Sequence, residues 1–144
     1  MLCSQRFSLR RLLDVAVLAP VALAACSGNS LEPIRPCPGD DWVTIDVSPG
    51  TTPRFTWRPA CGMAQLGVVP IADSFHGWRL YAADMAENPL PSGIRYGEVP
   101  EMGVEDAPAD TLVPGVVYQV ILLRWLDDRG ANGAYPRGFA YFTP

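Results

Sequence analysis

The chain has 144 residues, of which 11 are arginine, none is lysine and 15 are acidic, giving a formal net charge of −4. An acidic balance argues against nucleic acid as a partner and against charge-driven docking on anionic lipid. Hydrophobic residues make up 49% of a chain long enough for one domain with a real core.

The first 25 residues have the organisation of a secretory signal peptide. Residues 1–11 contain three arginines and no acid, and residues 12–25 read LLDVAVLAPVALAA. This apolar stretch is shorter than the about 20 residues that span a bilayer, and Asp14 and Pro20 interrupt it. A permanent transmembrane helix is therefore the weaker interpretation.

A cysteine stands where the apolar run ends. Leu23-Ala24-Ala25-Cys26 resembles the lipobox of bacterial lipoproteins. The resemblance implies cleavage before Cys26 and acylation of its sulfur and new amino group, and Ser27 implies the outer membrane in a cell with two membranes. One acyl chain binds a bilayer only marginally, at about 0.8 kcal/mol per buried methylene, whereas two or three chains make attachment lasting. The alternative is an ordinary signal peptide with an incidental cysteine.

The chain beyond the leader divides into a tether and a domain. Without residues 1–25 the chain has 119 residues and a net charge of −6, because the leader carries three arginines and one aspartate. Residues 26–41 are rich in proline and poor in apolar side chains, which is typical of a flexible tether. Residues 42–144 are expected to form one β-sandwich domain.

The four cysteines have different expected fates. Cys3 leaves with the leader and Cys26 carries lipid, so Cys37 and Cys61 remain to pair in an oxidising compartment. Two strands flanking a turn at residues 48–53 would bring both to one end of a hairpin. Closing this loop would stabilise the fold by about 3.5 kcal/mol on the chain-entropy model. Two cysteines and one histidine cannot complete a zinc shell, so no metal is expected.

The pattern of apolar residues from residue 42 onward has a period of two, which indicates strands. Strands are expected at residues 43–47, 54–57, 65–70, 77–83, 116–126 and 137–142. Val43, Ile45 and Val47 share one face of the first strand, and Phe55 and Trp57 share a face of the second. The residues expected to face inward from the next two strands are Leu66, Val68, Trp78, Leu80 and Ala82. Six or seven short strands separated by Pro/Gly turns predict an all-β sandwich of about seven strands.

Residues 112–120, LVPGVVYQV, match the pattern Leu-x-Pro-x-x-x-Tyr-x-Val and resemble the start of strand F in fibronectin type III domains. PRFTWRPA is similar to strand B of that family and RGFAYFTP to its last strand. The resemblance implies a fibronectin-III-like or immunoglobulin-like fold with a tyrosine corner of Leu112, Pro114 and Tyr118, in which the tyrosine hydroxyl bonds to the backbone just upstream. The segment 84–110 departs from the family, because it is longer and richer in proline than a compact module needs.

The strand expected at residues 116–126, which resembles strand F, also suggests an interaction surface. If Tyr118, Val120 and Leu122 face inward, an apolar row faces outward, and such a row requires a cover. The outward residues proposed as an interaction surface are Ile121, Leu123 and Trp125, with Val117 and Gln119 beside them. The alternative, which we favour at this point, is that the long loop covers the row with Leu90, Ile94, Val99 and Met102.

Other polar clusters have simpler explanations than catalysis or metal binding. His76, the only histidine, lies near Ser74 in the turn DSFHGW, where a solvated residue is the expected reading, so no catalytic residue is assigned. Residues 127–133, DDRGANG, could hold calcium but suit a tight turn better. The acids between residues 98 and 110 are expected to form a solvated loop. They are Glu98, Glu101, Glu105, Asp106 and Asp110.

Together these features predict a membrane-anchored lipoprotein of the cell envelope that is a binding or structural interaction module and not an enzyme. The expected partners are the membrane, through the lipid, and an envelope protein, with no nucleic acid and no cofactor. The alternatives are an accessory subunit of an envelope complex and, less favoured, an envelope hydrolase.

Overall fold

The computed structural model describes residues 42–73, 76–126 and 133–144, and these form eight β-strands and no helix. This confirms the all-β fold class predicted from the period-two pattern. The strands are β1 (Thr44–Val47), β2 (Arg54–Arg58), β3 (Gln65–Pro70), β4 (Trp78–Ala82), β5 (Ile94–Arg95), β6 (Gly103–Ala107), β7 (Tyr118–Trp125) and β8 (Ala134–Phe142).

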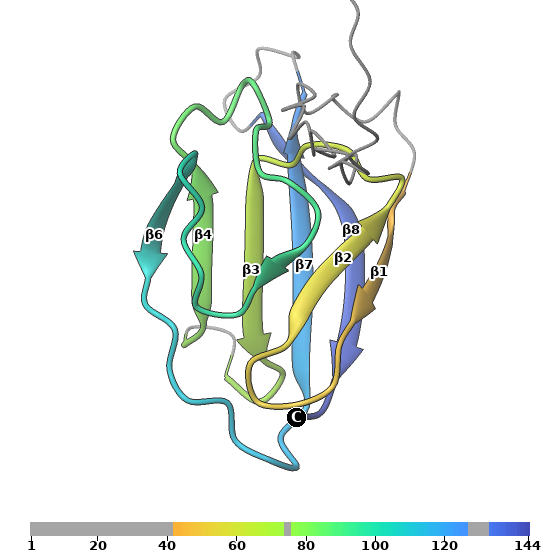
Figure 1. The fold of residues 1–144 in the computed structure, drawn as a ribbon, viewed down its shortest axis with the longest axis vertical. Helices are drawn as coiled ribbons and strands as arrows, with labels where there is room; N and C mark the ends of the chain where they lie inside the picture. The colour runs from red at the N-terminus through yellow and green to blue at the C-terminus, as the bar shows by residue number, and fades with distance from the viewer. Residues whose placement is uncertain (1–41, 74–75, 127–132) are drawn as a thin grey trace, which may run out of the picture. The chain divides into compact units, whose positions relative to one another are not determined.

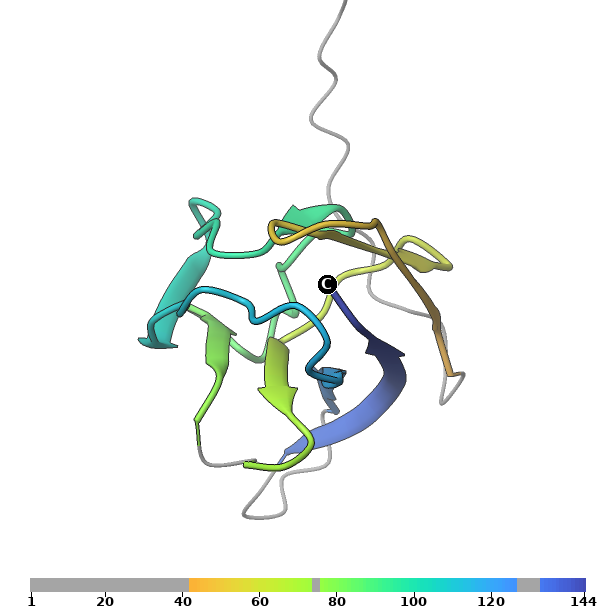
Figure 2. The ribbon, with the colours of Figure 1, turned by 90° about the horizontal axis from the view of Figure 1, so that it is seen from below.

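The strands form two antiparallel sheets (Figure 1). One sheet has the order β1-β2-β5 and the other β6-β4-β3-β7-β8. Viewed from below in Figure 2, the five-stranded sheet curves from β6 to β8, and the three-stranded sheet lies across its concave side. The result is a β-sandwich with an apolar layer between two sheets.

Strand order follows the immunoglobulin arrangement with two differences, the first of which is that no described strand takes the place of strand D beside β5. β1-β2-β5 correspond in order to strands A-B-E of that arrangement, and β3, β7 and β8 correspond to C, F and G. β4 and β6 extend the second sheet where variable-type domains place C′ and C″. The second difference is that β6 follows the E-like strand β5 in the chain. The segment 84–110 therefore contributes β5 to the three-stranded sheet and then β6 to the edge of the five-stranded sheet.

The six predicted strands are all present, with ends that differ by at most three residues. β5 and β6 were not predicted. β5 has only two residues, and β6 reads GVEDA, in which no residue is fully buried. Neither strand therefore carries the alternation of buried and exposed positions on which the prediction depended.

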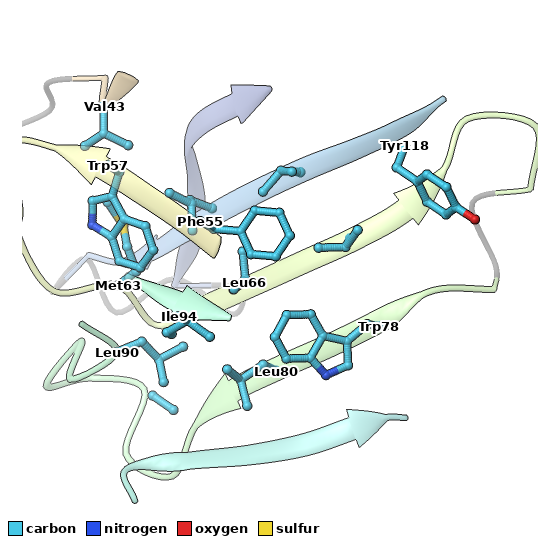
Figure 3. Close-up of a cluster of buried hydrophobic side chains, with 14 of the residues drawn as sticks. Val43, Phe55, Trp57, Met63, Leu66, Trp78, Leu80, Leu90, Ile94 and Tyr118 are labelled. Carbon is cyan, nitrogen blue, oxygen red and sulfur yellow. The ribbon is translucent and has the colours of Figure 1, made fainter. Parts of the chain in front are cut away.

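The core lies between the sheets and is built around aromatic rings (Figure 3). Phe55 and Trp57 point inward from β2, and Leu66, Trp78 and Leu80 face them from the five-stranded sheet, each at most 1% exposed. The rings of Phe55 and Trp78 lie 6.4 Å apart. The indole Nε1 of Trp57 donates to the carbonyl oxygen of Cys61 at 2.7 Å, so this buried polar atom is satisfied.

The two sheets approach each other closely beside β1 and β8. The backbone N–H of Val43 donates to the carbonyl oxygen of Arg137 at 2.7 Å. A Cβ atom at Gly138 would lie 2.8 Å from Cγ2 of Val43. Glycine at this position of β8 therefore allows β1 to pack against the strand.

Candidate functional site

β7 alternates as expected for strand F. Tyr118, Val120 and Leu122 are buried, whereas Ile121 and Leu123 are half-buried on the opposite face. The sequence therefore assigned the two faces of this strand correctly. Trp125 is also half-buried, and its indole lies against the backbone of Gly133, where any Cβ atom would clash.

The outer face of β7 continues onto β8, because residues paired across antiparallel strands share a face. Phe139 pairs with Ile121, and Tyr141 pairs with Gln119, whose amide nitrogen donates to the tyrosine hydroxyl at 3.1 Å. Phe139 is 42% exposed and Tyr141 63% exposed. The ring of Trp42, 59% exposed, lies 5.4 Å from that of Phe139.

These side chains form one continuous feature, here named the outer apolar patch. It consists of Trp42, Ile121, Leu123, Phe139 and Tyr141. None of the five carries a formal charge at neutral pH, although the chain as a whole is acidic. Sequence reasoning identified Ile121 and Leu123 but missed the three aromatic residues, since the register that brings β8 beside β7 is needed to see them together.

The long segment 84–110 does not cover this patch, so the cover predicted from Leu90, Ile94, Val99 and Met102 is wrong. Leu90 bridges to Met63, and Ile94 pairs with Phe55 of β2; both are buried in the core. Val99 and Met102 are 45% and 50% exposed. In Figure 1, β5 of this segment lies in the three-stranded sheet, and β6 lies at the edge of the five-stranded sheet opposite β8.

A tyrosine-corner contact is present at the start of β7. The backbone N–H of Val113 donates to the hydroxyl of Tyr118 at 3.0 Å. Leu112 is 2% exposed, whereas Pro114 lies at the surface. Gly115 follows with φ +83°, a left-handed conformation that glycine adopts without strain. The spacing of these residues lets the chain turn into β7 while the hydroxyl of Tyr118 accepts the hydrogen bond from Val113.

Among the cysteines, only Cys61 lies within the described residues. It is 3% exposed and follows β2 by three positions. Cys26 and Cys37 lie outside the described residues, so lipid attachment and the Cys37–Cys61 bridge stay predictions.

The histidine of the β3–β4 turn is oriented by a carboxylate. Nδ1 of His76 lies 2.6 Å from Oδ2 of Asp73, and the side chains are 82% and 48% exposed. Ser74 lies outside the described residues. An orienting acid beside a histidine is one part of a nucleophilic triad, but the ring of His76 makes no hydrogen bond to a hydroxyl among the residues described.

Near the β3–β4 turn, the phenol of Tyr96 has a raised pKa. Burial raises the pKa of its phenol to about 12, and Tyr118, Asp110 and Glu105 add to the effect. The hydroxyl donates to the carbonyl oxygen of Asp110 at 2.9 Å. The phenol therefore holds its proton at neutral pH, and its role is to fix the segment before β7 against the core.

The acids between residues 98 and 110 make local structural contacts. Glu105 accepts from the indole Nε1 of Trp78 at 2.9 Å, and Asp106 lies 3.3 Å from Nε of Arg79. Both acids are on β6, where charges on an edge strand discourage pairing with another chain. Within the described ranges no cluster of three or more His, Cys, Asp or Glu could hold a metal ion. The proposed calcium loop at residues 127–132 lies outside them.

Asn88 is a structural residue that the sequence analysis missed. Its side-chain oxygen accepts from the backbone N–H of Trp125 at 2.7 Å, and its side-chain nitrogen donates to the carbonyl oxygen of Trp125 at 3.0 Å. It is 4% exposed and has φ +49°, which asparagine tolerates better than most residues. It thereby joins the long segment to the end of β7. The only sequence signal was a turn-forming Asn-Pro pair.

The fold and the patch define a class, a β-sandwich with an exposed apolar sheet face. The comparisons with known proteins add nothing to this class. A scan against models of known families, a search of curated proteins and a search of solved structures each found no match.

Proposed function

We propose that this chain is an exported, lipid-anchored protein of the cell envelope whose β-sandwich is a binding or structural interaction module. The observation that carries the interaction role is the outer apolar patch. Its three aromatic residues are 42–63% exposed, and no other part of the described chain covers them. Contiguous apolar surface of this kind marks interaction sites in soluble domains.

The anchoring part of the proposal is supported by the sequence before the domain. The basic start, the short apolar core and Leu23-Ala24-Ala25-Cys26 all suit lipoprotein export. Among the residues that the structure describes, no helix could cross a membrane.

A bridge between Cys37 and Cys61 is proposed as part of the same account. Thr44, the first residue of β1, pairs with Arg58, the last of β2, so Cys61 follows β2 at the end of the hairpin where the chain enters β1. A thiol count under denaturing, non-reducing conditions tests it. Two free thiols would contradict the bridge, and none beyond the leader would support it.

The anchor is tested by labelling with radioactive palmitate. We expect label in the wild-type chain and its loss in Cys26→Ala. Cys3→Ala is the matched control, because this cysteine lies in the leader and the variant should retain label. Label that persists in Cys26→Ala would overturn the anchor.

The interaction role is tested by affinity capture from detergent-solubilised envelope. Ile121→Asp and Leu123→Asp place a charge in the patch, whereas Ile71→Asp, at a 56% exposed position in the loop after β3, is the control. Each variant is first checked for folding by circular dichroism. We expect the two patch variants to lose partners that the control retains. Identical partner lists for all three would contradict the proposal.

The alternative of an accessory subunit in an envelope complex would use the same patch, and capture of one stoichiometric envelope protein would favour it. A hydrolase is the weaker alternative. Its support is limited to the Asp73–His76 pair. It would require a hydrolytic activity of the wild-type chain that His76→Gln abolishes.

A further inference from the structure

We propose that the end of the sandwich where β7 begins binds a small organic ammonium compound. The starting observation is a hollow of about 310 Å³ at this end. Ligand sites in proteins begin at about this volume. The hollow includes no residue of the outer apolar patch, so this proposal goes beyond the interaction role and depends neither on that role nor on the lipid anchor.

Three parts of the chain form the walls of the hollow. β3 contributes Val68 and Pro70, the turn before β4 contributes His76 and Gly77, and the segment before β7 contributes Asp110 and Thr111. In Figure 2, which views this end of the sandwich, the segment before β7 crosses between the two sheets. A Cβ atom at Gly77 would lie 2.5 Å from the carbonyl oxygen of Val68, so glycine lets the turn lie close against β3.

The hydroxyl of Tyr118 offers the hollow a hydrogen-bond donor. The residue is 7% exposed and lines the hollow. Figure 3 shows its hydroxyl directed away from the other core side chains. The oxygen accepts from the backbone N–H of Val113 at 3.0 Å, but its own proton has no acceptor among the residues that the structure describes. A ligand oxygen in the hollow would satisfy this proton, so the site favours a ligand that carries a neutral acceptor.

The carboxylate of Asp110 gives the hollow its charge. It forms no ion pair with any residue that the structure describes, whereas Asp73 already pairs with His76. No arginine lines the hollow, and the chain has no lysine. Asp110 and Glu105 both contribute to the raised pKa of Tyr96, another lining residue, which indicates a negative potential at this wall. A positively charged ligand is therefore attracted to the hollow.

The remaining lining groups suit an ammonium ion on an apolar frame. In the neutral form of His76 in which Nδ1 donates to Asp73, Nε2 is an acceptor. Thr111 adds a hydroxyl to the same hollow. Val68 and Pro70 offer apolar surface to the hydrocarbon part of a ligand. The site therefore fits a short molecule with an ammonium group at one end and a hydroxyl at the other.

Other classes of ligand fit this hollow less well. An anion would meet the carboxylate of Asp110 with no arginine or lysine to receive it. A metal ion would need several ligands, and the described part of the chain has no cluster of three or more His, Cys, Asp or Glu. A neutral polyol would use the hydroxyls of Thr111 and Tyr118 but not the charge of Asp110. The charge of the ligand therefore separates these alternatives.

Three probes that share a phenol and differ at the other end test the role of charge. Tyramine carries an ammonium group, 4-hydroxyphenylethanol is neutral and 4-hydroxyphenylacetate is an anion. Each is titrated at neutral pH into the isotope-labelled full chain in a neutral detergent, and amide chemical shifts are followed by NMR. The amides of Gly77, Thr111 and Val113 report on the hollow, and those of Ile121 and Phe139 report on the outer apolar patch.

We expect tyramine to shift the amide signals around the hollow and to reach saturation. Its dissociation constant should be about three- to tenfold lower than that of the neutral probe, because water screens an exposed carboxylate. The anion should bind more weakly than either. Equal binding of the three probes, no saturable shift, or shifts centred on the outer apolar patch would overturn the proposal.

Asp110→Asn tests the carboxylate itself. The variant removes the charge but retains the backbone carbonyl that accepts from Tyr96, so it should fold. Glu101→Gln is the matched control, because it makes the same change of charge at an exposed position that does not line the hollow. We expect the dissociation constant of tyramine to rise about three- to tenfold in Asp110→Asn and to be unchanged in Glu101→Gln. Equal dissociation constants in the two variants would contradict Asp110 as the ammonium partner.

Tyr118→Phe tests the hydrogen-bond donor. Phenethylammonium, which lacks the phenol oxygen of tyramine, is the matched probe. We expect the variant to weaken the binding of tyramine by about two- to tenfold and to leave that of phenethylammonium unchanged. Circular dichroism checks that the variant is folded. An equal effect on both probes, or none on either, would contradict the hydroxyl of Tyr118 as a ligand contact.

Discussion

Replacing Tyr118 by Phe removes one hydroxyl and leaves the buried ring in place. The lost contact is the 3.0 Å bond that this hydroxyl accepts from the N–H of Val113. A hydrogen bond of this kind contributes about 1 kcal/mol to stability. Because the Val113 side chain is 53% exposed, water can reach this part of the chain and offset part of the loss. We therefore expect a loss of about 0.5–1 kcal/mol in the free energy of unfolding.

The assay is urea unfolding followed by tryptophan fluorescence, with thermal unfolding beside it. A loss of 1 kcal/mol corresponds to a fall of about 4–8 °C in the midpoint for a domain of this size, and the urea m-value should not change. Tyr141→Phe is the matched control, because its exposed hydroxyl accepts only from the amide of Gln119. Equal midpoints for Tyr118→Phe and wild type, or equal losses in both variants, would refute the reasoning.

Three further predictions concern other buried polar contacts. Asn88→Ala should lower the free energy of unfolding by about 2–4 kcal/mol, because the N–H and C=O of Trp125 both lose their hydrogen-bond partner. Asn88→Asp should have a stability between those of Asn88→Ala and the wild type, since it retains only the acceptor. Equal stability of all three forms in urea would contradict this. Trp57→Phe should cost about 1–3 kcal/mol through the lost bond to Cys61 and the smaller ring, and an unchanged thermal midpoint would refute it. Folding raises the pKa of Tyr96 from 10.0 to about 12, so the contribution of this group to stability should be complete below pH 10 and fall as the pH rises towards 12. Tyr96→Phe should lack this fall in the free energy of unfolding. A pH titration in which both forms lose stability equally would show the reasoning to be wrong.

The strands and their inward faces were predictable because one signal specifies both. Alternation along residues 54–57 and 78–82 places Phe55, Trp57 and Trp78 on buried faces, and the core contains all three. β5 and β6 were missed because a two-residue strand and an exposed edge strand have no alternation to detect.

The candidate surface was predicted only in part. Period two identified Ile121 and Leu123 as outward residues of one strand. Phe139 and Tyr141 also alternate in the sequence, but their place beside β7 depends on strand pairing, which a local pattern does not encode. The prediction that the segment 84–110 covers the outer face of β7 was wrong for the same reason. Apolar residues at 90 and 94 suit a core as well as a surface, and only the pairing of β5 with β2 decides between them.

The most direct test of the central claim, export and acylation at Cys26, is the intact mass of the protein purified from membranes without lipid-cleaving steps. The account predicts a chain that begins at Cys26 and carries the added mass of acyl groups on that residue. A chain that retains residues 1–25, or one that begins at residue 26 with no added mass, would contradict it.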